Sequence, residues 1–101
     1  MLIVAGEVVV EPGQMEAVRQ PLEQMMKATR AEPGCLAYAF SVDIADPCVL
    51  RVFERWESEA VLAAHFSTLH MGEFGAAMAA VEPKSMDIKV YGVSGELPLP
   101  G

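Results

Sequence analysis

Apolar residues in the first third of the chain follow two spacings, one typical of a strand and one of a helix. The segment from Leu2 to Val10 is apolar and rich in β-branched residues, which predicts a strand that Pro12-Gly13 ends. From Met15 to Thr29, apolar residues recur every three or four positions, as on one face of a helix. Pro21 lies inside this pattern and lacks a backbone donor, so we expect a kink or a late helix start there.

A second and a third strand are predicted after a helix stop at Glu32-Pro33-Gly34. Asp46-Pro47 marks the turn between a strand from Cys35 to Asp43 and a strand from Val49 to Trp56. The earlier strand alternates large residues (Leu36, Tyr38, Phe40 and Val42) with small ones (Cys35, Ala37, Ala39 and Ser41). The later strand places on one face Leu50, Val52, Glu54 and Trp56. Such alternation predicts that the two faces of the sheet have different packing partners.

Two short helices and a fourth strand are predicted in the remainder of the chain. Ser58 is suited to cap a helix that carries His65, and Ser67 or Thr68 is suited to cap another helix. The buried stripe of the latter helix is expected to consist of Met71, Phe74, Met78 and Val81. Glu82-Pro83 ends this helix, the segment from Met86 to Val93 predicts a strand, and residues 94–101 predict an extended tail.

The predicted order is strand, helix, strand, strand, helix, strand, with the second helix broken in two. This order is typical of the ferredoxin-like βαββαβ fold of the α+β class, an antiparallel sheet with helices on one side. We expect residues 1–101 to form a single domain. No helix is left for the other sheet face, whether it carries Ala37 and Ala39 or the alternating Val8 and Val10. A second copy would cover it, which predicts an obligate homodimer.

Composition and charge exclude several classes of partner. The chain is 52% hydrophobic and carries a net charge of −7 without a Lys/Arg cluster, so nucleic acid and anionic membrane surfaces would repel it. No segment approaches the ~20 apolar residues of a membrane span. The first residues lack the layout of a signal peptide. We therefore expect a cytoplasmic protein without a nucleic-acid or membrane partner.

Trp56 and His65 are the two main candidates for chemistry. A lone Trp is equally well explained as a core aromatic or as a flat wall for an aromatic ligand. His65 is expected on the inner stripe of its helix, where it is either a hydrogen-bonded core residue or a base that takes a phenolic or carbon-acid proton. His70 lies five residues further, about 140° around a helix. We therefore expect the two imidazoles to diverge and His70 to be exposed.

A pocket for a small ligand is expected between the sheet and the helices. The Tyr38 hydroxyl could hydrogen-bond a substrate oxygen there, although Tyr38 and Phe40 are also explained as core residues. Glu54 either orients His65 or, as is more common, pairs with Arg30 in a structural salt bridge. The residues expected to line the pocket are Trp56, His65, Tyr38, Phe40, Phe53 and Phe74, with Glu54 beside them.

Known cofactor and metal motifs are absent from the sequence. Neither CxxC nor HxxxH occurs, so no metal site is expected. No Gly-rich phosphate loop follows a strand, and no Ser stands in a nucleophile elbow. Cys35 and Cys48 are expected near opposite ends of the hairpin, too far apart for the ~5.5 Å Cα spacing of a disulfide, so two free thiols are expected. Any redox chemistry must therefore use electrons from the substrate itself.

Three short segments resemble the antibiotic biosynthesis monooxygenase family. They are the run from Thr29 to Tyr38, the run Phe53-Glu54-Arg55-Trp56, and His65, and the resemblance extends from about Ile3 to Val93. It implies a dimeric α+β barrel in which two sheets pack face to face. Its well-studied members oxidise quinol-like or anthrone-like aromatics without metal or flavin. A Trp at this place is part of the family pattern, which favours a ligand-binding role for Trp56.

Two branches of the family match the sequence poorly. The haem-degrading branch needs an Asn on the first strand, a Trp in the middle helix and a downstream His. This sequence contains no Asn, and His65 and Gly75 fall where that Trp and that His would be. Polyketide-oxidising members use an Asn, Trp and Tyr set, of which only Trp56 is plainly matched. The quinol-oxidase-like bacterial members are therefore the closest resemblance.

Two functions follow as hypotheses. The first is a cofactor-free monooxygenase that oxidises a quinol or a related phenolic or polycyclic aromatic with O2, with His65 as the base and Trp56 beside it. The second is a non-catalytic dimer of the same fold that binds or senses a small ligand. Both need an apolar pocket, so turnover with O2 is what distinguishes them.

Overall fold

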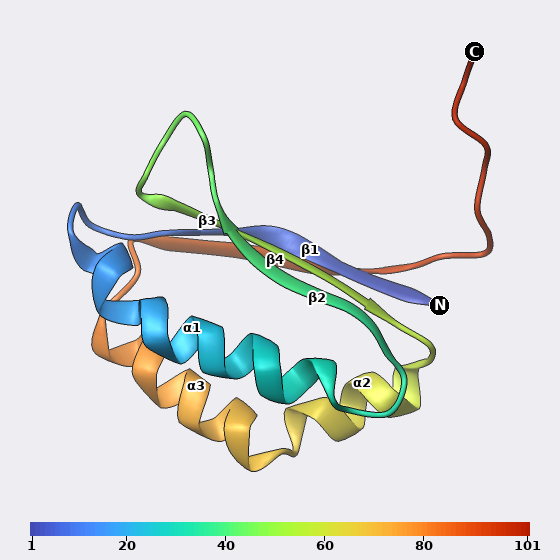
Figure 1. The fold of residues 1–101 in the computed structure, drawn as a ribbon, viewed down its shortest axis with the longest axis horizontal. Helices are drawn as coiled ribbons and strands as arrows, with labels where there is room; N and C mark the ends of the chain where they lie inside the picture. Colours follow the sequence, from blue (N-terminus) through green and yellow to red (C-terminus); the bar gives the residue numbers. More distant parts are fainter.

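The computed structural model describes residues 1–101, which form four strands and three helices (Figure 1). The strands are β1 (Leu2–Val9), β2 (Cys35–Val42), β3 (Val49–Trp56) and β4 (Ser85–Gly92). The helices are α1 (Gln14–Arg30), α2 (Glu59–Phe66) and α3 (Leu69–Ala80). Every element predicted from the hydrophobic pattern is present.

The four strands form one antiparallel sheet in the order β2-β3-β1-β4. All three helices lie on one side of this sheet, and the other side is bare (Figure 1). This confirms the predicted ferredoxin-like α+β fold. The pairing brings Tyr38 of β2 and Val4 of β1 to either side of Glu54, so the candidate site lies on an inner strand, near the end of β3.

Helix α1 begins at Gln14 and continues through Pro21 to Arg30, so the prediction of a late helix start is wrong. Gly13 precedes the helix with a φ of 88°, a backbone conformation that glycine adopts without strain. Val18, which lies before the proline, is completely buried against Val8 and Val10. Tertiary packing of this first half therefore outweighs the helix-breaking tendency of Pro21.

The core between the sheet and the helices consists of two groups of buried side chains. One contains Val8, Val10, Val18, Leu22, Leu50 and Met78. The other contains Val4, Met25, Tyr38, Trp56 and Leu62. Val8 and Val10 thus lie on the side that the helices cover, so of the two alternatives for the bare face the one with Val8 and Val10 is wrong. The candidate site residues belong to the second group.

A bulge at Leu36 changes the side-chain order predicted for β2. Cys35 pairs with Trp56 and Ala37 with Arg55, so Leu36 is the extra residue between them. Cys35 therefore packs against the buried group around Trp56, and Leu36 is exposed. The prediction that Cys35 shares a face with Ala37 is wrong because strict alternation ends at this bulge.

The edge strand β4 is exposed along its whole length. The segment after Gly92 has no helix or strand and leads away from the body of the protein (Figure 1).

Cys35 and Cys48 are not joined by a disulfide. None of the three helices has the length and apolar character needed to cross a membrane.

Candidate functional site

Trp56 and His65 lie against each other in the interior, Trp56 from the end of β3 and His65 from the last turn of α2. Their ring centroids are 4.8 Å apart, and the two residues are 0% and 1% exposed. Strand alternation turns Trp56 toward the helices. Helix α2 begins where the Ser58 hydroxyl accepts a hydrogen bond from the Val61 amide. His65 follows about two helical turns later, on the face of α2 that packs against Trp56.

Glu54 is buried two residues before Trp56, on the same face of β3. The indole Nε1–H of Trp56 donates to Glu54 Oε1 at 2.9 Å. Burial raises the pKa of the Glu54 carboxyl above its usual range, and the Trp56 hydrogen bond and nearby His65 oppose this shift. The expected ion pair with Arg30 does not form, because Arg30 Nε donates to the Tyr38 carbonyl instead.

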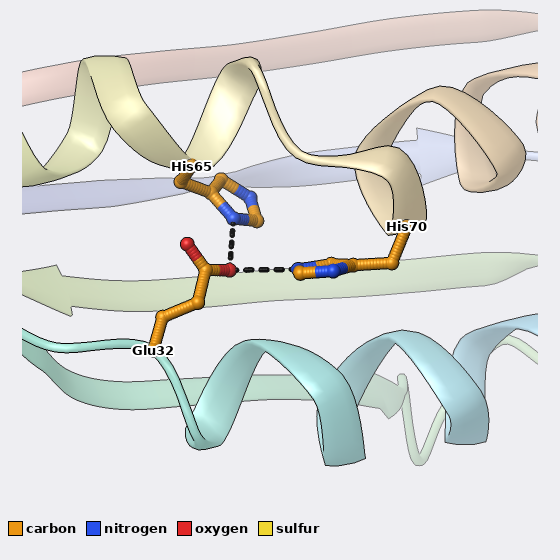
Figure 2. A group of neighbouring side chains, drawn as sticks. All are labelled: Glu32, His65 and His70. Atoms are coloured by element: carbon orange, nitrogen blue, oxygen red, sulfur yellow. Dashed lines mark hydrogen bonds and ion pairs between the residues drawn. The ribbon is translucent and has the colours of Figure 1, made fainter.

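Glu32 lies between the two histidines, as Figure 2 shows. One oxygen, Oε2, is 2.7 Å from Nδ1 of His65 and 2.8 Å from Nε2 of His70. The three side chains are 13%, 1% and 27% exposed in the order Glu32, His65, His70. A single carboxylate oxygen thus links the buried imidazole of His65 to the partly exposed imidazole of His70.

The expected divergence of His65 and His70 is wrong. The 140° rotation applies only within one continuous helix, but α2 ends at Phe66 and α3 begins at Leu69. The intervening turn reorients the chain, and the Thr68 hydroxyl caps α3 by accepting from the Met71 amide. The two imidazoles therefore point to the same carboxylate from different helices.

The sequence pattern around Glu32 predicts only a helix stop and gives no sign that this carboxylate belongs to the site. Glu32 lies in the connection between α1 and β2, and its partners follow 33 and 38 residues later. The nearest available signal was composition, since the chain contains only two histidines and both bind this carboxylate. Together the three side chains also form a group that could hold a metal ion.

The hydrogen bond to Glu32 determines which nitrogen of His65 can act as a base. A carboxylate accepts, so Nδ1 carries the hydrogen and Nε2 of the neutral ring carries the free lone pair. Ionised Glu32 also stabilises the positive charge that forms when Nε2 takes a proton. This base-and-carboxylate arrangement has the logic of a catalytic triad, in which the third group orients the base.

Tyr38 contacts both members of the central pair. Its ring centroid is 5.6 Å from that of His65 and 6.4 Å from that of Trp56, edge-on in both cases. Burial, followed by the negative charge of Glu54, raises the pKa of the Tyr38 hydroxyl far above its usual value. Tyr38 is therefore a protonated phenol that can donate a hydrogen bond.

Phe40 and Phe74 extend this aromatic group, and Phe53 does not. The Phe40 ring is 5.2 Å from Tyr38 edge-on and stacks on Phe74 at 5.4 Å. Phe53 is 43% exposed and lies on the bare face of the sheet, between inward-facing Val52 and Glu54. Its expected place in the pocket is wrong, because neighbouring strand residues point to opposite faces.

The space between Trp56 and His65 is filled by their own rings. None of the five main hollows of the subunit is lined by either residue. A hollow of about 260 Å³ between α1 and α3 borders the aromatic group, with Met25, His70 and Phe74 in its wall. The expected pocket with both Trp56 and His65 on its wall is therefore closed in the single subunit, because their direct packing leaves no gap.

Several known proteins are similar to this chain in sequence. The curated relative described as the probable quinol monooxygenase YgiN of Escherichia coli K12 is 34% identical over 88 residues, covering 77% of this chain and 85% of the relative. The uncharacterized protein sll1783 of Synechocystis is 30% identical over 93 residues, covering 92% of this chain. The match spans 63% of the Synechocystis protein, which is thus considerably longer than this chain.

Solved structures show the same architecture. A Deinococcus radiodurans protein described as a putative antibiotic biosynthesis monooxygenase superposes with a TM-score of 0.91 over 100% of both chains, at 24% identity. The Mycobacterium tuberculosis protein Rv0793 superposes with a TM-score of 0.85 at 25% identity, covering 96% of this chain and 98% of its own. Residues 1–77 match the family model described as antibiotic biosynthesis monooxygenase. The chain belongs to the antibiotic biosynthesis monooxygenase family.

Proposed function

We propose that this protein is a cytoplasmic, cofactor-independent monooxygenase that oxidises a quinol or a related phenolic or polycyclic aromatic with O2. The observation that carries the proposal is the 2.7 Å contact between Glu32 Oε2 and His65 Nδ1, which leaves Nε2 of a buried imidazole as a base beside Trp56. The similarity to a relative described as a probable quinol monooxygenase supports this substrate class.

His65 starts the proposed reaction by taking the phenolic proton at Nε2. The resulting anion is electron-rich and passes one electron to O2, which gives a substrate radical and superoxide. Recombination of these radicals, with return of a proton, forms a hydroperoxide. Loss of water from the hydroperoxide leaves one oxygen atom in the product as a carbonyl. The substrate supplies all the electrons, so the reaction balances without another reductant.

Trp56 and the aromatic group around it would bind the ring of the substrate. Tyr38, Phe40 and Phe74 provide an apolar wall, and the Tyr38 hydroxyl and the Glu54 carboxyl are its polar groups. We propose that the substrate enters through the hollow between α1 and α3, because Phe74 and His70 line it. Entry requires these rings to move apart, since Trp56 and His65 are closed to solvent.

We further propose that two copies pair through the bare face of the sheet to form the dimeric barrel. This face carries the small residues Ala37 and Ala39, together with Phe53 and Tyr91, which are half exposed. It also carries charged side chains that are already paired with one another, Arg51 with Glu7 and Lys89 with Asp87. Small and aromatic residues beside such paired charges are suited to burial against a second copy. An obligate dimer of this kind is expected to bury roughly 2,000 Å² or more.

The direct test is oxygen uptake by metal-free protein with a panel of quinols and anthrone-like phenolics. With ¹⁸O₂, one labelled atom should enter the product and the other should appear in water, which is the signature of a monooxygenase. Absence of oxygen uptake across the panel would contradict the proposed activity.

A non-catalytic dimer that binds a small aromatic ligand is the second candidate. The closed packing of His65 against Trp56 favours it, because a base that is 1% exposed cannot meet a substrate without rearrangement. Trp56 is the only Trp of the chain, so its fluorescence reports directly on this place. Quenching by a quinol without oxygen uptake would favour binding alone.

A further inference from the structure

Glu32, His65 and His70 form a compact set of metal-ligand atoms. One nitrogen of each ring and one carboxylate oxygen of Glu32 all lie within 4.8 Å of one another. Each residue comes from a different part of the fold, namely the α1–β2 connection, α2 and α3 (Figure 2). A search for spacing motifs such as HxxxH cannot find such a set, because tertiary packing and not one helix brings the ligands together.

The charge of Glu32 is not matched by a Lys or Arg. The only charged or chargeable partners within ion-pair distance are the two imidazoles. Arg30, two residues away, is engaged with the Tyr38 carbonyl and the Met26 sulfur. Glu54 is close to His65 and is a second acidic group in this interior. A cation at this place would therefore compensate a partly buried negative charge.

Two imidazoles and one carboxylate are a common ligand set for divalent first-row transition metals. Bonds of about 2.0–2.2 Å to Zn²⁺ require ligand atoms roughly 3.4 Å apart in a tetrahedron. The present oxygen-to-nitrogen distances of 2.7 and 2.8 Å are those of hydrogen bonds, so the carboxylate oxygen must withdraw slightly to admit an ion. Glu32 lies in a loop connection and His70 is the second residue of α3, so both can adjust.

We propose that Glu32, His65 and His70 bind a divalent first-row transition metal ion, for which Zn²⁺ is the probe, through Nδ1 of His65, Nε2 of His70 and the Glu32 carboxylate. The two hydrogens that now lie between the imidazoles and the carboxylate move to the opposite nitrogen of each ring, which leaves a lone pair on His65 Nδ1 and on His70 Nε2 for the ion. One position of a tetrahedral ion remains for water or an exogenous ligand, on the side where His70 reaches the surface.

Metal binding and the proposed base role of His65 exclude each other. A neutral imidazole that coordinates an ion through Nδ1 carries its hydrogen on Nε2, so Nε2 has no lone pair for a substrate proton. The ion would therefore act as an inhibitor of the proposed oxidation. The existence of the site does not depend on that oxidation, because the site can be tested by binding alone.

The test uses the full-length, untagged protein after treatment with a chelator, titrated with Zn²⁺ by calorimetry and by NMR of the imidazole protons. The chain has only two histidines, so both sets of ring signals can be followed without ambiguity. We expect one ion per chain, with both rings shifting together until one equivalent has been added. No saturation below about 100 μM Zn²⁺, or a shift of His70 alone, would overturn the proposal.

Variants identify the ligands. Glu32→Gln keeps a hydrogen-bond acceptor but removes the charge, and His70→Gln removes one ligand at a partly exposed position. Each should weaken Zn²⁺ binding by at least about tenfold. Glu73→Gln, one helical turn beyond His70, is the matched control and should leave the affinity unchanged. Equal affinity in all three variants would overturn the assignment, and the wild-type NMR titration decides the question if a variant fails to fold.

Discussion

The indole of Trp56 donates a 2.9 Å hydrogen bond to the carboxyl group of Glu54, two residues earlier on the same face of β3. Both side chains are buried, so this bond replaces water that the carboxyl group has lost. It does not fully compensate for burial, because the pKa of Glu54 is still raised. The pair therefore links the position of the Trp56 ring to the ionisation of Glu54.

Glu54→Gln should change how stability depends on pH. In the folded protein Glu54 holds its proton to a higher pH than its ordinary value of 4.5, so its contribution to stability falls as pH rises through that value. Gln can still accept from the Trp56 indole but does not ionise. The free energy of unfolding of the variant should therefore rise relative to wild type as the pH increases above 4.5. Urea unfolding at each pH measures this, and a constant difference would contradict it.

His65→Gln should lower quinol-dependent oxygen uptake by about 10²–10⁴-fold at neutral pH, the usual contribution of a general base. The loss should be smaller at high pH, where the phenol ionises without a base. Gln is chosen because Ala would open a cavity beside Trp56, at a cost of about 2–5 kcal/mol. Oxygen electrode measurements across a range of pH test this. Unchanged turnover by the folded His65→Gln variant would contradict the role of His65 as the base.

Glu32→Gln should lower turnover less than His65→Gln does. The amide oxygen can still accept from Nδ1 of His65, but it does not stabilise the imidazolium that forms in the reaction. A charge-assisted hydrogen bond exceeds a neutral one by about 1–1.5 kcal/mol, which corresponds to about a tenfold loss. Glu23→Gln, on the exposed side of α1, is the control and should keep full turnover. Equal turnover by Glu32→Gln and the control Glu23→Gln would show that the charge of Glu32 has no such role.

Phe53→Ala should weaken the proposed dimer without unfolding the subunit, because Phe53 lies on the bare face of the sheet and outside the core. Removal of an aromatic residue at the centre of an interface costs about 2 kcal/mol, or about a 30-fold rise in the dissociation constant. Leu69→Ala, at an exposed position of α3, is the control. Sedimentation equilibrium measures both, and a monomeric wild type at micromolar concentration would contradict the dimer itself.

Gly6→Ala and Gly72→Ala should have opposite effects on stability. A Cβ at Gly6 would lie 2.1 Å from the Asp87 carbonyl oxygen and 2.6 Å from the Ile88 Cα, so β1 and β4 would have to separate. We expect a loss of about 3 kcal/mol. Gly72 is in α3 with nothing within 4 Å of such a Cβ, and Ala there should gain about 0.5–1 kcal/mol. Thermal unfolding of both variants checks this pair.

The sequence by itself determined the elements and most of the side-chain directions, because these depend on neighbours within a few residues. Alternation in β3 placed Glu54 and Trp56 on one face, and the same alternation placed Phe53 on the other, although the predicted pocket included all three. The stop at Glu32-Pro33-Gly34, the cap at Ser58 and a cap at either Ser67 or Thr68 were also readable, since breakers and caps act locally.

Only the tertiary structure decided which side chains meet. Glu32, His65 and His70 are linked because α1, α2 and α3 pack on the same side of the sheet, and no local pattern encodes that arrangement. The bulge at Leu36 depends on the pairing of β2 with β3, so it could not be read from β2 alone. Pro21 remained inside α1 for a similar reason, since the packing of Val18 against β1 stabilises the turns before it. Local spacing predicts elements, whereas long-range packing creates the site.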